Sequence, residues 1–459
     1  MALLGGASHG EATERRQLTF DAQTAAPRPE PMIMGVGVHF GIGGSYNYDP
    51  RRAADLVRDI GFTSVRDDLV WPLFVRENVH KNASPPPQIW RLYRFLGLAG
   101  VKPLLILGHN HPLIEGGTRP MTAGGREAFA GFSAKAAGFV SRFQPMFEIW
   151  NEWNLSADFN PPWVVGAGKE GDPRAARDYL DLVKTTLPAL NKAVPKSPVL
   201  VGVSGYDEDW LWTQAIMAGG VMRGAQGLSI HLSNHCHQTI AKRTATEAID
   251  RVDLLQRLLM KDGAPPVPVY VSEIGWPTAP LTPCVIKAEQ QADYLAQFLF
   301  WAGATPWLKG AWVYQLKDQG VHPDQLEDNF GIFTYDYKPK PAACAVREAV
   351  RLLKGSSAFR VERPFPDMFV VQLGGARDAA GKVRLVAWTT TGTLKGRLVL
   401  PAGVQAGARR LCGGPQAADA EGFAVGSEPL VIDVDGTSAT LEAILDPLER
   451  RVDQGPPAR

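Results

Sequence analysis

Two glutamates, Glu152 and Glu273, each end a short apolar run, in the stretches IWNE and VYVSE. A carboxylate at the end of a buried strand is costly to desolvate, so it should be paired, solvated or functional. An ion pair with Arg66 would explain either glutamate alone. Both together, among nearby tryptophans, fit a chemistry in which one carboxylate attacks an anomeric carbon and the other gives a proton to the leaving oxygen.

The elements that must position these glutamates are apolar, β-branched runs that alternate with helical patterns. Between the first two runs, Asp49 can cap a helix and Gly61 can end it. Near-continuous apolar strands suit a parallel sheet buried on both faces. The alternation therefore predicts a (β/α)8 TIM barrel at residues 32–354. The eight predicted strands are residues 34–40, 62–68, 102–108, 145–152, 198–204, 227–233, 267–275 and 310–316.

After Gly355 the pattern changes to short strands separated by Gly, Asp and Pro, without long helical stretches. This pattern predicts a small C-terminal antiparallel β-sandwich at residues 355–450, followed by a flexible tail at 451–459. Residues 1–31 are expected to form a leader or an extended segment. The stretch RQLTFDAQ within them could add one strand to the sandwich.

Barrel enzymes build their sites at the carboxyl ends of the strands, and polar residues gather at those positions here. Besides the two glutamates they are His39, Arg66, Asp67, His109, Asn151, His231 and Gln315. Several of the twelve tryptophans also fall there, where an indole face can stack on a sugar ring. Core packing is the alternative for each of them, and it is favoured for Trp150 and Trp212. These tryptophans are Trp71, Trp150, Trp153, Trp163, Trp210, Trp212, Trp276 and Trp312.

Asn151–Glu152 after the fourth predicted strand and Glu273 after the seventh resemble the acid/base and nucleophile of retaining glycoside hydrolases of clan A. The resemblance covers the barrel, and the tail resembles the β-sandwich that many of these enzymes carry. Within the clan the chain is most similar to family 39 and its bacterial exopolysaccharide-degrading relatives, with family 5 as a close competitor. The stretches that carry this similarity are GVHF, LVRDIGFTSVRDDLVW, FEIWNEWN and NFGIFTYDYKPKPAA.

The resemblance assigns roles to the two carboxylates. It makes Glu273 the nucleophile, kept ionised by Arg66, and Glu152 the acid/base. Retaining enzymes hold the two carboxyl groups about 5 to 5.5 Å apart. Trp150 and Trp153 should give Glu152 less polar surroundings, which would raise its pKa as an acid requires.

The resemblance also implies contacts to an oligo- or polysaccharide substrate. Asn151 would bind the 2-hydroxyl, and Trp312 would form the platform beneath the reacting sugar, with Tyr314 on the same strand face. Loop tryptophans favour an extended groove. The expected substrate-binding residues are Arg66, His109, Asn151, Trp153, His231, Trp276, Trp312 and Tyr314.

One motif departs from the clan. Many members have a His-x-Tyr arrangement after strand six, and its Tyr hydroxyl touches the nucleophile. Here His231 is followed by Leu232 and Ser233, so the tyrosine is missing. Either a residue from another loop contacts Glu273, or the site is shaped for an unusual substrate.

Three other functions are consistent with parts of the pattern. The pairs His109-x-His111 and His235-x-His237 have metal-ligand spacing, but metal-dependent barrel hydrolases usually place such a pair after the first strand. A non-catalytic carbohydrate-binding barrel would not need both glutamates. A transglycosylase would use the same two glutamates with a sugar as acceptor. We expect neither a metal nor another cofactor.

The composition favours a small or uncharged partner. The 459 residues carry a net charge of +1, which gives no basic field for nucleic acid or an anionic membrane. No apolar run approaches the roughly 20 residues that span a bilayer. Residues 1–31 show no intact signal peptide, although a polysaccharide-degrading enzyme would be secreted or periplasmic; a trimmed leader and a cytoplasmic location both stay open.

The four cysteines show no CxxC spacing, so neither a zinc ribbon nor a thioredoxin-type site is expected. Buried free thiols are the simplest interpretation. A bridge between Cys236 and Cys284 is the alternative, because both lie in loops at one end of the predicted barrel.

Overall fold

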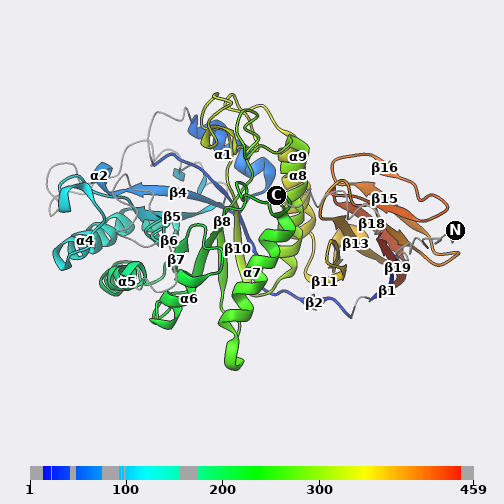
Figure 1. The fold of residues 1–459 in the computed structure, drawn as a ribbon, viewed down its shortest axis with the longest axis horizontal. Coiled ribbons are helices and arrows are strands. Elements are labelled where there is room, and N and C mark those ends of the chain that lie inside the picture. The colour runs from blue at the N-terminus through cyan, green and yellow to red at the C-terminus, as the bar shows by residue number, and fades with distance from the viewer. Residues whose placement is uncertain are drawn as a thin grey trace, which may run out of the picture.

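The computed structural model describes residues 14–21, 23–41, 48–74, 93–94, 96–97, 100–155 and 174–445. Eight parallel strands close into a barrel, and a second, all-β unit lies beside it (Figure 1). This arrangement confirms the predicted fold class. The barrel strands are β3 (Ile33–Gly37), β4 (Ser64–Val70), β5 (Lys102–Gly108), β6 (Met146–Ile149), β7 (Val199–Ser204), β8 (Gly227–Leu232), β9 (Val269–Ile274) and β10 (Leu308–Val313).

Helices follow the barrel strands and cover the outside of the barrel. The first begins as its sequence indicates, because the Asp49 carboxylate accepts hydrogen bonds from the backbone N–H groups of Arg51 and Arg52. Gly61 ends it with φ of 92°, a left-handed conformation that favours glycine. The helices are α1 (Pro50–Ile60), α2 (Trp71–Phe74), α4 (Ala123–Val140), α5 (Arg174–Ala193), α6 (Leu211–Ala218), α7 (Ala245–Leu259), α8 (Ala288–Ala304) and α9 (Pro341–Lys354). Short 3₁₀ turns lie at Glu115–Gly117, Ser141–Phe143, Ile240–Lys242, Lys261–Gly263, Glu327–Asn329 and Arg377–Ala379.

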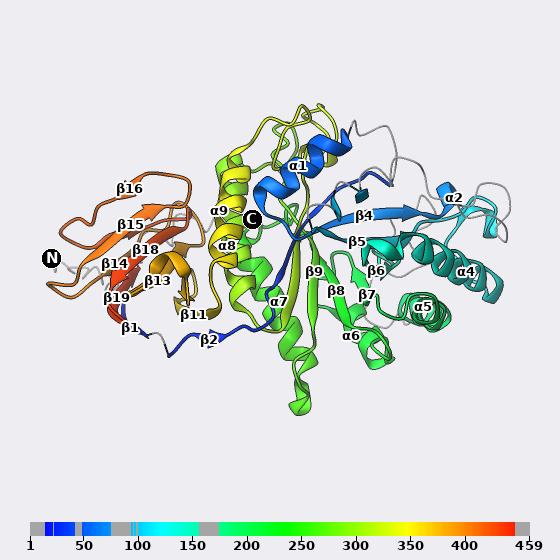
Figure 2. The same ribbon diagram turned by 180° about the vertical axis from the view of Figure 1, so that it is seen from behind.

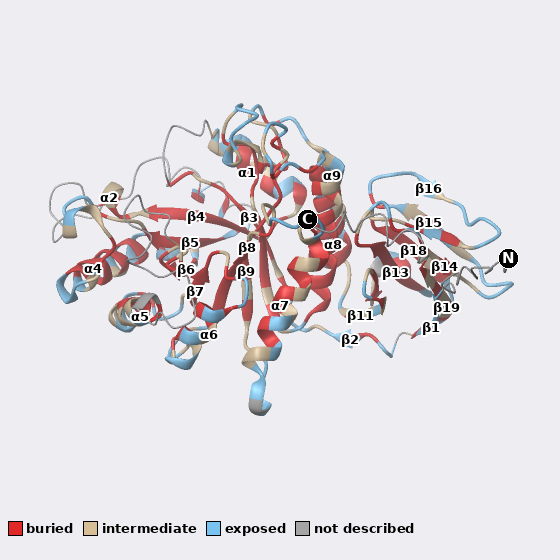
Figure 3. Cartoon of the chain, viewed as in Figure 1, coloured by how far each residue is buried: buried red, intermediate tan, exposed pale blue. Residues whose placement is uncertain are grey.

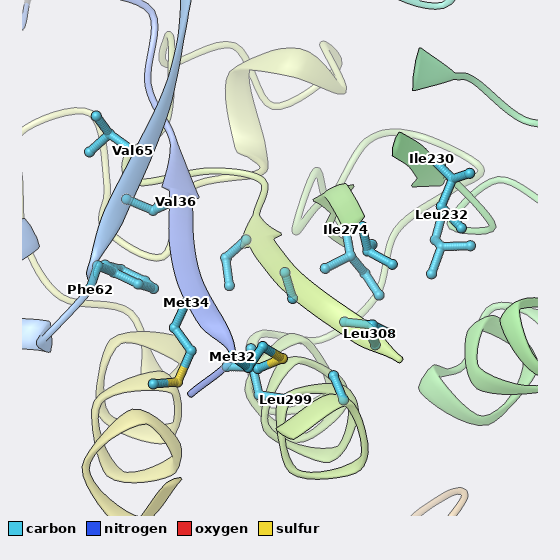
Figure 4. Close-up of a cluster of buried hydrophobic side chains, with 14 of the residues drawn as sticks. Met32, Met34, Val36, Phe62, Val65, Ile230, Leu232, Ile274, Leu299 and Leu308 are labelled. Carbon is cyan, nitrogen blue, oxygen red and sulfur yellow. The ribbon is translucent and has the colours of Figure 1, made fainter. Parts of the chain in front are cut away.

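A continuous apolar core fills the space between the barrel strands and the helices. Residues that point outward from the strands, among them Met34, Val36 and Val65, lie in one cluster with Leu299 of α8 (Figure 4). The strands are buried along almost their whole length (Figure 3). Burial on both faces explains why their sequences are apolar without simple alternation.

The inside of the barrel has its own small core at the amino ends of the strands. Its members, which we call the apolar layer, are Leu104, Met146, Leu200 and Trp312. Trp312 requires two glycines beside it, because a Cβ on Gly35 or Gly310 would come within 2.1 or 2.5 Å of the indole.

The second unit consists of two antiparallel sheets, as predicted for a β-sandwich. One sheet has the order β1-β19-β14-β17 and the other β16-β15-β18-β13-β12-β11-β2. Strand β1 pairs along its full length with β19, which confirms that the RQLTFDAQ segment adds a strand here. The strands are β1 (Glu14–Asp21), β2 (Ala26–Pro27), β11 (Ala358–Phe365), β12 (Met368–Gly374), β13 (Lys382–Thr389), β14 (Gly396–Val399), β15 (Ala406–Arg410), β16 (Pro415–Gln416), β17 (Phe423–Val425), β18 (Leu430–Asp435) and β19 (Ser438–Leu445).

Several contacts join the barrel to the sandwich. The segment that holds β1 and β2 runs from the sandwich to the barrel (Figure 2). Near its end, the Arg28 guanidinium donates hydrogen bonds to the last carbonyls of α8, including that of Ala302 at 3.1 Å. Between helix α8 and the sandwich, Gln297 of α8 donates a hydrogen bond to the Ser427 carbonyl of the sandwich at 2.8 Å.

All four cysteines form disulfides, so the simple interpretation as free thiols is wrong. Cys236 and Cys284 are joined, and this bridge links the loop after β8 to the loop after β9. A second bridge between Cys344 of α9 and Cys412 of the sandwich was not expected. Among the described helices, none is both long and apolar enough to cross a bilayer.

Candidate active site

Arg66 of β4 lies inside the barrel, where its guanidinium binds two glutamates at once. Its Nε donates to Glu148 at 2.6 Å and its Nη1 donates to Glu273. Its Nη2 donates to the Asn151 side-chain oxygen at 2.8 Å. Burial alone would lower the pKa of Arg66, but the charges of Glu148 and Glu273 outweigh burial and raise it. The ion pair expected between Arg66 and Glu273 is therefore present, and Glu148 shares it.

Glu148 was not among the residues singled out from the sequence. It is fully buried in β6 and accepts a hydrogen bond from Ser229 at 2.5 Å, and Ser229 in turn contacts Ser272 at 2.7 Å. We call Arg66, Glu148, Ser229 and Ser272 the charged layer, since it lies inside the barrel between the apolar layer and the pocket. A carboxylate in the middle of an apolar strand was the signal that could have identified Glu148.

Glu152 and Glu273 meet at the carboxyl ends of β6 and β9, with His231 of β8 between them. One oxygen of each carboxylate and one ring nitrogen of His231 all lie within 4.8 Å of one another. His231 Nδ1 is 2.8 Å from Glu152 and 3.4 Å from Glu273. The side chains that contact Glu273 are thus Arg66 of β4 and His231 of β8, two residues on barrel strands rather than in another loop.

The neighbours of His231 determine which of its ring nitrogens carries the proton. A guanidinium can only donate, so His231 Nε2, at 3.1 Å from Arg66 Nη2, accepts. The neutral ring therefore carries its proton on Nδ1 and donates it to Glu152. Burial alone would raise the pKa of Glu152, but this hydrogen bond and the charge of Arg66 lower it.

The lowered pKa of Glu152 differs from the expectation that Trp150 and Trp153 raise it. Both indoles turn away from the carboxylate into the core, where they lie edge to face with centroids 5.2 Å apart. Glu152 is left beside polar groups on the pocket side.

A second buried carboxylate, Asp68 of β4, holds two histidines at the pocket. His39 Nδ1 and His109 Nε2 each lie 3.1 Å from a different oxygen of Asp68. Burial alone would raise the pKa of Asp68, but the hydrogen bonds from His109 and His39 lower it below its usual range. His109 is thus placed in the pocket as expected, and Asp68 is a further residue that sequence reasoning missed.

A pocket of about 360 Å³ lies at the carboxyl end of the barrel. Its lining includes His39, Asp68, His109, Glu152 and Glu273. Its other side carries a chain of edge-to-face rings, in which Phe330 lies 5.1 Å from Tyr314 and 4.9 Å from His235. The Tyr314 hydroxyl donates to Glu327 at 2.8 Å. Burial and the charge of Glu273 raise the pKa of Glu327. Tyr314 and Asn151 both line the pocket, as expected.

The tryptophans expected to bind substrate lie elsewhere. Trp153 and Trp276 are completely buried, and Trp276 packs against Tyr294 of α8 with centroids 5.4 Å apart. Trp312 belongs to the apolar layer, where its Nε1 donates to Ser64 at 3.1 Å, so it cannot form a platform for a sugar. Tyr314, two residues further along the chain on the same face, reaches the pocket instead. Of the other tryptophans noted in the sequence, Trp71, Trp150, Trp210 and Trp212 are also buried, and Trp163 lies outside the described residues.

The histidine pairs do not assemble into a metal centre among the described residues. His109 lines the pocket, whereas His111 is buried against Trp71. His237 contacts Glu208. The one described group with metal-ligand proximity is Glu152, His231 and Glu273, and the Arg66 guanidinium already contacts two of its members.

No family model and no curated protein matches this chain. Solved structures do match it. A family 39 glycoside hydrolase from the gut symbiont Bacteroides cellulosilyticus superposes with a TM-score of 0.68 at 21% identity, over 88% of this chain and 81% of its own. The GH39 enzyme from Xanthomonas axonopodis gives 0.55 at 15%, over 92% and 96%. A GH5_18 structure from Streptomyces cattleya gives 0.54 at 22%, over 72% and 81%. At the level of the fold, these matches confirm the resemblance to family 39 with family 5 as competitor.

Proposed function

We propose that this protein is a retaining glycoside hydrolase that cleaves an oligo- or polysaccharide through a covalent glycosyl-enzyme. The observation that carries the proposal is the proximity of Glu152 and Glu273, whose nearest oxygens lie within 4.8 Å on one pocket wall. Retaining enzymes hold their carboxyl groups about 5 to 5.5 Å apart, whereas inverting enzymes need roughly 6.5 to 9.5 Å to admit a water. The likeness in fold to glycoside hydrolases supports the same conclusion.

In the first step Glu273 attacks the anomeric carbon while Glu152 gives its proton to the leaving oxygen. Arg66 holds one oxygen of Glu273, and this contact orients the attacking carboxylate. In the second step Glu152 takes a proton from water, which attacks the anomeric carbon and releases Glu273. Each group thus returns to its starting state after one turnover.

The surroundings of Glu152 suit its role as base more directly than its role as acid. The hydrogen bond from His231 stabilises the ionised form in the free protein. A sugar that fills the pocket displaces water, and repulsion between the two carboxylates then strengthens because it is less screened. Substrate binding therefore promotes the protonated form of Glu152 that the first step requires.

Substrate contacts in this proposal come from polar groups and one ring. Asn151 accepts from Arg66 with its oxygen, so its amide N–H groups remain available for a sugar hydroxyl. His109 and Tyr314 line the same pocket. Tyr314, just beyond the end of β10, is the ring that contacts the sugar in place of Trp312. The two disulfides suit an oxidising compartment, which supports secretion or a periplasmic location.

The proposal is tested by screening hydrolysis of a panel of polysaccharides and aryl glycosides. Proton NMR of the first product released by the wild type should show the anomeric configuration of the substrate. Product lengths and added sugar acceptors distinguish hydrolysis from transglycosylation. An inverted first product would contradict the two roles given to the glutamates.

A further inference from the structure

The loop at residues 233–244, which follows β8, forms a fixed wall of the pocket. Asn234 donates from its amide to the carbonyls of Lys242 and Thr244, both at 2.8 Å. Arg243 donates to the carbonyl of Pro283 at 2.6 Å, in the loop after β9. The Cys236–Cys284 bridge joins the same two loops covalently. The wall is thereby held in place relative to β9, the strand that carries Glu273.

His235 presents its ring to the pocket from this wall. The ring stands edge to face on Phe330, with centroids 4.9 Å apart. Its Nδ1 is buried, yet among the described residues it has no hydrogen-bond partner. Buried polar atoms in proteins are nearly always hydrogen-bonded, so an exception in a pocket needs an explanation.

The position of His235 relates it to one side of the proposed reaction. Its ring lines the same pocket as Glu152 and Glu273. Glu152 is the group that faces the leaving oxygen in the proposed mechanism. A polar atom from the same pocket lining is therefore a candidate contact for the sugar bound at Glu152.

We infer that His235 is a substrate-positioning residue whose Nδ1 hydrogen-bonds a sugar hydroxyl beside Glu152 when the pocket is filled. This inference rests on the proposed function and adds the class of group that the wall recognises. Burial lowers the pKa of His235 to about 4, so the ring is neutral near pH 7 and suits an uncharged hydroxyl better than an ionised group.

His237, two residues along the same loop, serves as a matched control. Its Nδ1 accepts from the Thr239 backbone N–H at 2.9 Å, and its Nε2 lies 3.2 Å from Glu208. Both of its ring nitrogens have protein partners, and it is not part of the pocket lining. His237 is thus an ordinary loop histidine.

The test compares kcat and KM of His235→Phe, His235→Asn, His235→Gln and His237→Phe with the wild type, on a glycoside that the wild type hydrolyses. His235→Phe keeps the ring contact with Phe330 but removes both nitrogens. It should raise KM roughly three- to tenfold, the effect of one lost hydrogen bond, with little change in kcat or melting temperature. His235→Asn should recover most of the loss because its amide stands where Nδ1 stood, while His235→Gln should not. His237→Phe should leave KM unchanged.

Substrates that lack single hydroxyls identify the group that His235 binds. For one of them the penalty in KM seen with the wild type should disappear in His235→Phe, because the same hydrogen bond is already missing. An active wild type whose KM is unchanged in His235→Phe, or whose penalties are the same in both proteins for every hydroxyl, would overturn this inference alone. A wild type that hydrolyses no glycoside would overturn the proposed function, and this inference with it.

Discussion

The apolar layer and the charged layer fill neighbouring parts of the same barrel interior with opposite chemistry. One strand, β6, supplies a residue to both layers. β6 contributes Met146 to the apolar layer and Glu148 to the charged layer, and β10 contributes Trp312 before the chain reaches Tyr314 at the pocket. Residues two apart on a strand share a face. Two residues toward the carboxyl end of β6, the apolar contact of Met146 is therefore replaced by the polar contacts of Glu148.

The two layers stabilise the protein in different ways. The apolar layer gains from burial and close packing, so loss of a side chain there costs stability directly. The charged layer contains the buried ion pair of Arg66 with Glu148, and Arg66 also binds Glu273 above the layer; buried ion pairs contribute little net stability. Its Arg66 instead holds the Glu273 carboxylate in position. Substitutions in and above the two layers should therefore separate activity from stability.

The largest effect is expected for Glu273→Gln, above the charged layer. The amide cannot attack the anomeric carbon, so kcat should fall by at least about four orders of magnitude on every glycoside. The melting temperature should change little, since the amide oxygen still accepts from Arg66. A parallel measurement of kcat and melting temperature checks both. Substantial residual turnover would remove Glu273 from the role of nucleophile.

Glu152→Ala should have a smaller effect that depends on the leaving group. Glycosides with poor leaving groups need proton donation, so their kcat/KM should fall by roughly 10² to 10⁴. Activated aryl glycosides should lose much less in the first step. A series of aryl leaving groups gives the comparison, and an equal loss across the series would contradict the acid role.

Trp312→Leu tests the apolar layer. The indole fits above Gly35 and Gly310, and a leucine leaves part of that space empty. We expect the free energy of unfolding to fall by about 3 kcal/mol, measured by denaturant titration, with little change in the kcat/KM of the folded protein. Tyr314→Phe is the paired variant and should show the reverse. If Trp312→Leu reduced activity and left stability unchanged, the layers would not be distinct in this way.

The smallest effect concerns Asp67, which lies in the middle of β4 and alternates with the inward-facing Arg66 and Asp68. Burial and the charge of Asp68 raise the pKa of Asp67 to about 7, compared with about 3.9 in an unfolded chain. The folded state thus keeps a proton that the unfolded state releases, so stability is lost as pH rises from about 4 to about 7. Asp67→Asn should lack this loss, so its stability relative to the wild type should rise by about 2 to 3 kcal/mol between pH 5 and pH 8.

The measurement for Asp67 is the difference in unfolding free energy between variant and wild type at pH 5 and at pH 8. The difference between the two pH values isolates Asp67, since all other groups titrate in both proteins. An asparagine can accept from the backbone N–H groups of Gly41 and Asp68, as the aspartate does, so the fold should be retained. Equal differences at the two pH values would contradict the prediction.

The barrel and the two glutamates could be predicted because both depend on local patterns. Each apolar run became a strand within a few residues of its predicted ends, and the polar residue after a run lies at the carboxyl end of the barrel whatever the loops do. Asp49 and Gly61 fixed the ends of α1 through backbone hydrogen bonds and a left-handed turn, which need no distant partner. The strand from RQLTFDAQ was also recognisable from its alternation.

The tryptophans could not be placed in this way because their orientation depends on how the chain turns after each strand. Trp150 and Glu152 both have positive φ, at 70° and 47°, which is unusual for residues other than glycine. This turn directs the indoles into the core and Glu152 into the pocket. Trp312 and Tyr314 share a face, and only their depth in the barrel distinguishes a core residue from a pocket residue.

Other features needed long-range information. Glu148 becomes understandable only when Arg66 is known to lie beside it, 82 positions away in sequence. The Cys344–Cys412 bridge depends on how the sandwich packs against α9. The spacing of apolar residues along the sequence does not predict such packing between domains.

The pairing of β1 with β19 has a consequence for how the chain acquires its structure during synthesis. Glu14 of β1 lies opposite Leu445 of β19. Strand β1 therefore cannot pair with β19 until almost all of the described residues have been synthesised. The barrel, whose contacts lie between these two strands, can form first. The sandwich is therefore not a contiguous module, and a gene segment that encodes residues 355–450 alone would be transferred to another protein without two of its strands, β1 and β2.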